Sequence, residues 1–269
     1  MDKVWRTDVL ARAWVTVRQN EGAPGIDQVT LPDVEEYGVD RLLGELAMEL
    51  REGRYRPLPA RRVFIPKPGQ PGESRPLSIP AVRDRIVQAA LKIVLEPVFE
   101  ADFLPCSFGF RPRRGAHDAL QVLIDESWRG CGWLVETDIA NCFEAIPHIE
   151  LIKAVEERVC DQSVLTLLRV ILRAGVSENG VVRKADRGLP RVGWFLRCSA
   201  TSICIGSIGP GTCVSTVSWS GTPTMVRHEH NRRFRCRRKL LTWCCTGDGG
   251  RPSGTAHAGE VPNRRRLLR

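Results

Sequence analysis

Apolar residues recur at helical spacing in several segments of the first 190 residues of this 269-residue chain. Residues 83–96 place apolar side chains three and four positions apart, and Pro97 follows them, so the pattern predicts a helix that ends at Pro97. Similar stripes over residues 116–124, 151–159 and 164–172 predict three further helices. Each stripe would face an apolar core.

Other segments show the composition of strands. Residues 133–139 alternate briefly and are rich in β-forming side chains, which predicts a strand that runs into Asp138. Two short apolar stretches, one ending in Ile65-Pro66 and one at residues 75–80, bracket a turn rich in Gly and Pro. This arrangement predicts a hairpin.

Periodicity of either kind is missing after Pro190. Residues 191–269 hold six of the ten cysteines, three of the seven tryptophans and fourteen basic residues, thirteen of them arginine, against only three acids. Because the surface of an evolved domain mixes Lys, Glu and Asp, this composition suggests a change of reading frame. We therefore divide the chain into residues 1–190 and a tail of residues 191–269 that we expect to be irregular and disordered.

The net charge of +9 lies entirely in that tail. Residues 1–190 carry a net charge of −2 and the tail carries +11, so the basic balance says little about the first segment. Ten irregularly spaced cysteines, without an apolar signal segment at the N-terminus, favour a reducing cytoplasm. No apolar run approaches the roughly 20 residues that a membrane span needs. We expect a soluble, cytoplasmic protein with no membrane partner.

The richest chemistry lies in residues 136–148, which read Glu-Thr-Asp-Ile-Ala-Asn-Cys-Phe-Glu-Ala-Ile-Pro-His. Asp138 stands at the end of the predicted strand, where its carboxylate could hold Mg²⁺, and the backbone carbonyl of Ile139 could add a second oxygen ligand. Phe143 could pack under the sugar of an incoming nucleotide. The alternative is an Asp that caps a turn and a Phe that belongs to the core.

The predicted hairpin carries a cation on each side of its turn, Lys67 and Arg75. Lys supplies a compact charge and Arg a bidentate fork, so the two together could grip a triphosphate. The alternative is a solvated hairpin with ordinary surface charges.

Four segments of the chain form a recognisable series: residues 22–27 (Gly-Ala-Pro-Gly-Ile-Asp), 75–91, 107–112 (Ser-Phe-Gly-Phe-Arg-Pro) and 137–148. In this order they resemble blocks of the group II intron reverse transcriptase/maturase family. The resemblance implies an RNA-directed DNA polymerase of the right-hand type. Its fold class would be α+β, with the fingers and an incomplete palm present in residues 1–190.

The resemblance also implies roles for individual residues. Asp138 would be catalytic and a metal ligand, Ile139 a second metal and nucleotide contact, Phe143 the sugar gate, and Lys67 and Arg75 triphosphate contacts. The template strand would be positioned by Phe108, Gly109, Phe110 and Arg111. The implied cofactor is Mg²⁺, and the implied partners are an RNA template or intron RNA, a DNA primer and a dNTP.

The chain departs from the family pattern at residues 188–193. The family has Gly-Leu-Pro-Gln-Gly-Gly there and a later Tyr-Ala-Asp-Asp hairpin, whereas this chain reads Gly-Leu-Pro-Arg-Val-Gly and contains no Tyr-Ala-Asp-Asp. Two-metal phosphoryl transfer needs carboxylates from more than one strand, so we expect a catalytically incomplete chain.

Two alternatives to a polymerase fragment remain. One is a maturase-like module that binds RNA without polymerising, through arginine-rich stretches such as residues 51–62 and 111–114. The other is a non-functional remnant of a mobile element.

The genetic code allows both missing blocks to be recovered in one shifted frame. Joining the last base of each codon to the first two of the next permits Gln-Gly-Gly and an apolar stretch between Pro190 and Ile208, and Tyr-Ala-Asp-Asp between Val217 and Met225. We predict that one nucleotide is lost near the Pro190 codon, and that DNA sequencing finds both blocks in an open alternate frame. Codons that exclude those residues would instead make the tail a genuine domain.

Overall fold

The helices and strands of this chain form two units. The computed structural model describes residues 1–66, 69, 72–109, 111–129, 133–136, 146–184, 187–188, 241–242 and 258–260. The first unit spans residues 1–101 and 143–200, and the second spans residues 102–142 and 201–269. Both units therefore include residues from each side of the catalytic block predicted from the sequence.

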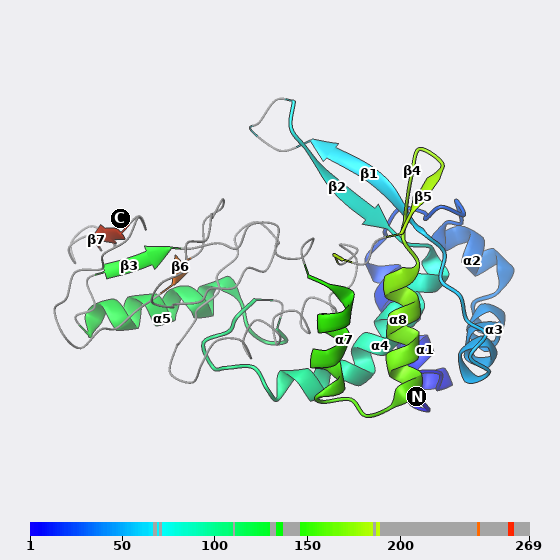
Figure 1. The fold of residues 1–269 in the computed structure, drawn as a ribbon, viewed down its shortest axis with the longest axis horizontal. Coiled ribbons are helices and arrows are strands. Elements are labelled where there is room, and N and C mark those ends of the chain that lie inside the picture. Colours follow the sequence, from blue (N-terminus) through cyan, green and yellow to red (C-terminus); the bar gives the residue numbers. More distant parts are fainter. Residues whose placement is uncertain are drawn as a thin grey trace. The chain divides into compact units, whose positions relative to one another are not determined.

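The helices of the first unit pack through their apolar stripes. They are α1 (Thr7–Gln19), α2 (Leu31–Tyr37), α3 (Val39–Arg51), α4 (Val82–Glu100), α7 (His148–Glu156) and α8 (Gln162–Arg173). α1 packs on α4 and on α3, and α7 packs on α8 (Figure 1). Ile86 of α4, Leu151 of α7 and Leu165 of α8 are each fully buried, so these predicted stripes do face a core.

α4 does not end where the sequence predicts. It continues through Pro97 to Glu100. Proline removes one backbone hydrogen bond from a helix interior and crowds the preceding turn, so continuation needs a compensating gain. Phe99, two residues beyond Pro97, is 1% exposed, and burial of a Phe side chain stabilises a fold by roughly 1.5–3 kcal/mol. Packing at Phe99 therefore accounts for the extension.

The sheet of the first unit is built around the predicted hairpin. Strands β1 (Ala60–Pro66) and β2 (Ser74–Ile79) pair antiparallel, with Arg61 opposite Ile79 and Pro66 opposite Ser74. β4 (Val176–Glu178) pairs parallel with the start of β1, and β5 (Val181–Arg183) completes the order β2-β1-β4-β5. Because β4 meets β1 only near its base, most of the β1–β2 hairpin extends beyond β4, as Figure 1 shows.

The segment of residues 22–27, the first of the four family-like blocks, is pressed against the start of α4. A Cβ atom added to Gly25 would lie 2.5 Å from the Cα atom of Ala81, which is too close for any side chain. Arg61 of β1 donates a hydrogen bond to the Pro24 carbonyl at 2.7 Å, and Arg85 of α4 donates to the Ala23 carbonyl. This loop is therefore fixed to both the hairpin and α4.

The second unit contains α5 (Ala116–Trp128) and β3 (Trp133–Glu136). The helix predicted over residues 116–124 is confirmed. The strand predicted over residues 133–139 starts as expected, and its continuation through Asp138 lies outside the described residues. Two short strands from the tail, β6 (Leu241–Thr242) and β7 (Ala258–Glu260), pair antiparallel with β3 on its two sides. No helix in the described part of the chain is long and apolar enough to cross a membrane.

Candidate functional site

The β1–β2 hairpin, which we call the arm, carries the described cation of the predicted triphosphate site. Arg75 lies on β2 directly opposite Ile65, so these two side chains project from the same face of the sheet. The turn between the strands uses Gly69 at φ 75° and Gly72 at φ 85°, a backbone conformation that glycine adopts without strain. Lys67, the other predicted cation, lies outside the described residues.

Arg75 has hydrogen-bonding capacity to spare. Its Nε atom is buried and has no partner among the described residues, and the same holds for Arg62 on β1. A buried donor without a partner costs free energy, and a guanidinium is well shaped to donate to phosphate oxygens. The Nε atoms of Arg61 and Arg83 are also without partners in the described part of the chain, although both side chains donate to protein oxygens through other nitrogens, so an unpaired Nε does not by itself mark a ligand site.

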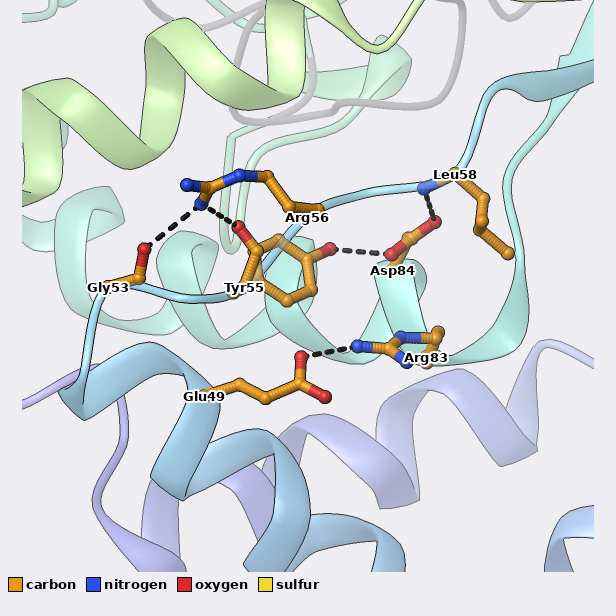
Figure 2. Close-up of polar contacts among 7 residues, drawn as sticks. All are labelled: Glu49, Gly53, Tyr55, Arg56, Leu58, Arg83 and Asp84. Carbon is orange, nitrogen blue, oxygen red and sulfur yellow. Dashed lines mark hydrogen bonds and ion pairs between the residues drawn. The ribbon is translucent and has the colours of Figure 1, made fainter.

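A buried carboxylate lies at the base of the arm, where Figure 2 shows its contacts. Asp84, in the first turn of α4, accepts a hydrogen bond from the Tyr55 hydroxyl at 2.6 Å and another from the Leu58 backbone N–H at 2.9 Å. Beside it, Arg83 donates to the Glu49 carboxylate at 2.5 Å and lies over the Tyr55 ring. These contacts join α3, the linker of residues 52–59 and α4. Sequence analysis did not single out either Tyr55 or Asp84 as a functional residue.

Burial controls the protonation of this cluster. The pKa of Asp84 is raised from its usual 3.8 to about 6, because burial disfavours the charged form. The hydrogen bonds from Tyr55 and Leu58 and the charge of Arg83 lower the pKa, but they offset burial only in part. The pKa of Tyr55 is raised well above its usual value by burial and by the neighbouring Asp84, so its hydroxyl keeps its proton and donates.

The loop predicted to position the template is held together by its own arginines. Arg111 is 9% exposed, donates hydrogen bonds to the carbonyls of Leu104 at 2.8 Å and Ser107 at 2.9 Å, and lies over the Phe103 ring. Phe108 is also buried, at 7% exposed, and packs with Ala119 of α5.

The orientation of these side chains changes their expected contribution. Arg111 and Phe108 face into the loop, whereas Gly109 is partly exposed and Arg113 is exposed, at φ 59°. Phe110 lies outside the described residues. The predicted template contacts through Arg111 and Phe108 therefore stay predictions, and the structure gives both side chains an internal packing role.

The centre of the predicted catalytic site, with Asp138, Ile139 and Phe143, lies outside the described residues. The structure does describe the end of that block. Ile146 accepts a hydrogen bond from the Gly188 N–H at 2.9 Å, and His148 Nε2 lies 2.7 Å from the Gly188 carbonyl oxygen. The catalytic block is thus joined directly to the segment where the chain departs from the family pattern. Among the described residues, no group of three His, Cys, Asp or Glu side chains could hold a metal ion.

Comparison with known proteins gives consistent matches. Residues 65–207 match the family described as reverse transcriptase (RNA-dependent DNA polymerase). Protein YkfC of Escherichia coli strain K12 is 40% identical over 194 residues, which cover 68% of this chain and 49% of YkfC. The group II intron-encoded protein LtrA of Lactococcus lactis subsp. cremoris is 34% identical over 188 residues, covering 70% of this chain and 31% of LtrA. The chain thus spans about half the length of YkfC and about a third of that of LtrA.

A solved structure supports the same fold. The partial Cas6-RT-Cas1–Cas2 complex contains a chain that superposes with a TM-score of 0.53 at 17% sequence identity, covering 84% of this chain and 38% of that one. At this identity the likeness concerns the fold alone.

The internal role of Arg111 is testable against its exposed neighbour. We expect Arg111→Ala to lower the thermal unfolding midpoint by several degrees, because it removes the side-chain donor from the buried Ser107 carbonyl and one of the two donors to the Leu104 carbonyl. Arg113→Ala removes an exposed cation of the same loop and should shift the midpoint by about 1 °C or less. Equal midpoints for the two variants would show that Arg111 does not stabilise the loop.

The raised pKa of Asp84 makes stability depend on pH in a definite direction. The folded chain holds this proton more tightly than the unfolded chain. Protonation of Asp84 therefore adds to the free energy of unfolding, fully below about pH 4, and this addition is lost as the pH rises through about 6. Its size is up to about 3 kcal/mol. The free energy of unfolding should be measured at pH 4.5 and at pH 7 for both proteins. The difference between the two pH values should be smaller in Asp84→Asn than in the unchanged chain. An unaltered pH dependence in the variant would contradict the assignment.

Proposed function

This chain belongs to the reverse transcriptase family and to its group II intron reverse transcriptase/maturase branch, and from that premise we propose its function. We propose that it is the part of an RNA-directed DNA polymerase that binds the incoming nucleotide and the template strand. The chain corresponds to the N-terminal part of that branch and, on this proposal, does not polymerise alone. One observation carries the proposal: the family match covers residues 65–207, but the 269 residues contain no Tyr-Ala-Asp-Asp segment, which supplies the second set of catalytic acids in this family.

The arm is the part that would hold the incoming nucleotide. The antiparallel register supports this role, because it carries Arg75 on a rigid strand rather than in a flexible turn. In the proposed function Lys67 joins Arg75 on the triphosphate, and Phe143 contacts the sugar.

The loop of residues 103–114 would guide the template. Here Arg111 and Phe108 shape the loop from inside, while Gly109 and Phe110 offer backbone and ring to the strand. The exposed cation Arg113 adds a charge for a phosphate of RNA or DNA. The near-neutral charge of residues 1–190 supports local contacts of this kind rather than a broad basic surface.

On this proposal the chain contains only part of the metal site. Reverse transcriptases use Mg²⁺, a hard cation that prefers oxygen ligands, and Asp138 with the Ile139 carbonyl would supply two of them. Both ligands come from one segment, whereas a two-metal clamp needs carboxylates from separate strands. On this proposal Mg²⁺ is the cofactor of the intact family site, of which this chain holds only one ligand segment.

A primer-extension assay tests the proposal. The purified chain, mixed with an RNA template, an annealed DNA primer, dNTPs and Mg²⁺, should give no more product than a reaction without protein. A frame-restored protein, with one nucleotide reinserted at the Pro190 codon, should extend the primer. Asp138→Asn in that protein should reduce the rate by about a thousandfold or more, since it weakens a metal ligand.

Two outcomes of that assay would contradict the proposal. Extension by the unrestored chain would show that the missing acidic block is not needed. Full activity of Asp138→Asn in the frame-restored protein would show that Asp138 is not a metal ligand.

A further inference from the structure

We propose that Asp84 is a positioning residue, which sets the direction of the arm by holding the chain on both sides of it at one carboxylate. Leu58 precedes β1 by two residues, and Asp84 follows β2 by five. The two oxygens of Asp84 are therefore shared between the segment that enters the arm and the helix that leaves it. The consequence for triphosphate binding rests on the function proposed above, but the position of the arm does not.

The carboxylate makes its contacts outside its own helix. An acid in the first turn of a helix ordinarily caps a free N–H or complements the helix dipole. Asp84 instead accepts from Tyr55, 29 residues earlier, and from Leu58, 26 residues earlier. The start of α4 has no side-chain cap. These hydrogen bonds therefore connect separate segments and add little to the helix itself.

Burial makes these contacts hard to replace. Asp84 is 1% exposed and Tyr55 is 3% exposed, so water cannot readily take the place of either partner. Arg56 further restrains the same linker by donating to the carbonyls of Gly53 at 3.0 Å and Tyr55 at 2.8 Å. The entry to β1 is thus fixed at successive residues before the strand begins.

The other described restraints on the arm all lie at the start of β1, where Arg61 donates to the Pro24 carbonyl. β4 pairs with β1 only at Ala60 and Arg61, and the Ala60 N–H donates to the Gly175 carbonyl at 3.1 Å. A β1–β2 arm held only at these first two residues of β1 could pivot about them. A second attachment at Asp84, on the side where the chain enters α4, removes this freedom.

Charged groups around Asp84 come from three elements. Arg83 lies on its own helix and is engaged by Glu49 of α3, and Asp27 comes from the loop of residues 22–27. Asp27 opposes the negative charge of Asp84, whereas Arg83 favours it. A neutral amide in place of the carboxylate avoids the cost of a buried charge. It can still accept from the Leu58 N–H while donating to the Tyr55 oxygen.

Hydrogen exchange measured by mass spectrometry on the full chain, without nucleotide or nucleic acid, tests this role. In Asp84→Ala we expect amide exchange in β1 and β2 to rise by roughly tenfold or more, with exchange in α8 unchanged, because the arm opens locally. Asp84→Asn should stay within about threefold of the unchanged chain, since the amide keeps both hydrogen bonds. Asp33→Ala is the control: it removes the hydrogen bond from the Thr30 N–H to the Asp33 carboxylate at the start of α2, in the same unit, and should leave the arm unchanged.

The outcomes separate positioning from general stability. Exchange that rises equally in α8 and in the arm, or not at all, would overturn the proposal, and so would an Asn variant that behaves like the Ala variant. Because the measurement involves no catalysis or ligand, a failed primer-extension test would leave this proposal standing. Likewise, unchanged exchange in Asp84→Ala would leave the proposed polymerase ancestry untouched.

Discussion

The carboxylate of Asp84 lies 1% exposed inside the first unit, where an ion without partners would be strongly destabilising. Its partners are the Tyr55 hydroxyl and the Leu58 N–H, so the linker of residues 52–59 cannot move away without leaving the charge uncompensated. α3 is tied in through Glu49 and Arg83. The directions in which β1 begins and α4 departs are consequently coupled, and this coupling sets the direction of the arm.

The sequence predicts the elements whose determinants are local. The stripe of α8 faces the core as its spacing requires, and the hairpin follows from apolar stretches around a Gly/Pro turn. The prediction that α4 ends at Pro97 was wrong. The periodic pattern carries no information on whether burial of Phe99 offsets the hydrogen bond lost at Pro97. β4 and β5 were not predicted: three-residue strands carry little pattern, and β4 pairs with β1 across more than 100 residues.

Less of the candidate site could be predicted, since a motif fixes residue types but not directions. Arg75 was expected on the hairpin and lies there, whereas Arg111 and Phe108 carry the family pattern and turn inward. Asp84 was missed because a first-turn acid is common in helices, and its donors lie far back in the chain. The roles of Asp138 and Lys67, outside the described residues, stay predictions.

The positioning elements and the metal site of a reverse transcriptase depend on different parts of the chain. The contacts described for the arm, its base and the loop of residues 103–114 all lie among segments before Pro190. A two-metal clamp is different, because its carboxylates must converge from separate strands. The hydrogen bond between Ile146 and Gly188 joins the end of the catalytic block to the point where the family pattern stops. A frame change at Pro190 would therefore remove the strands that supply the remaining acids while leaving the positioning elements in place.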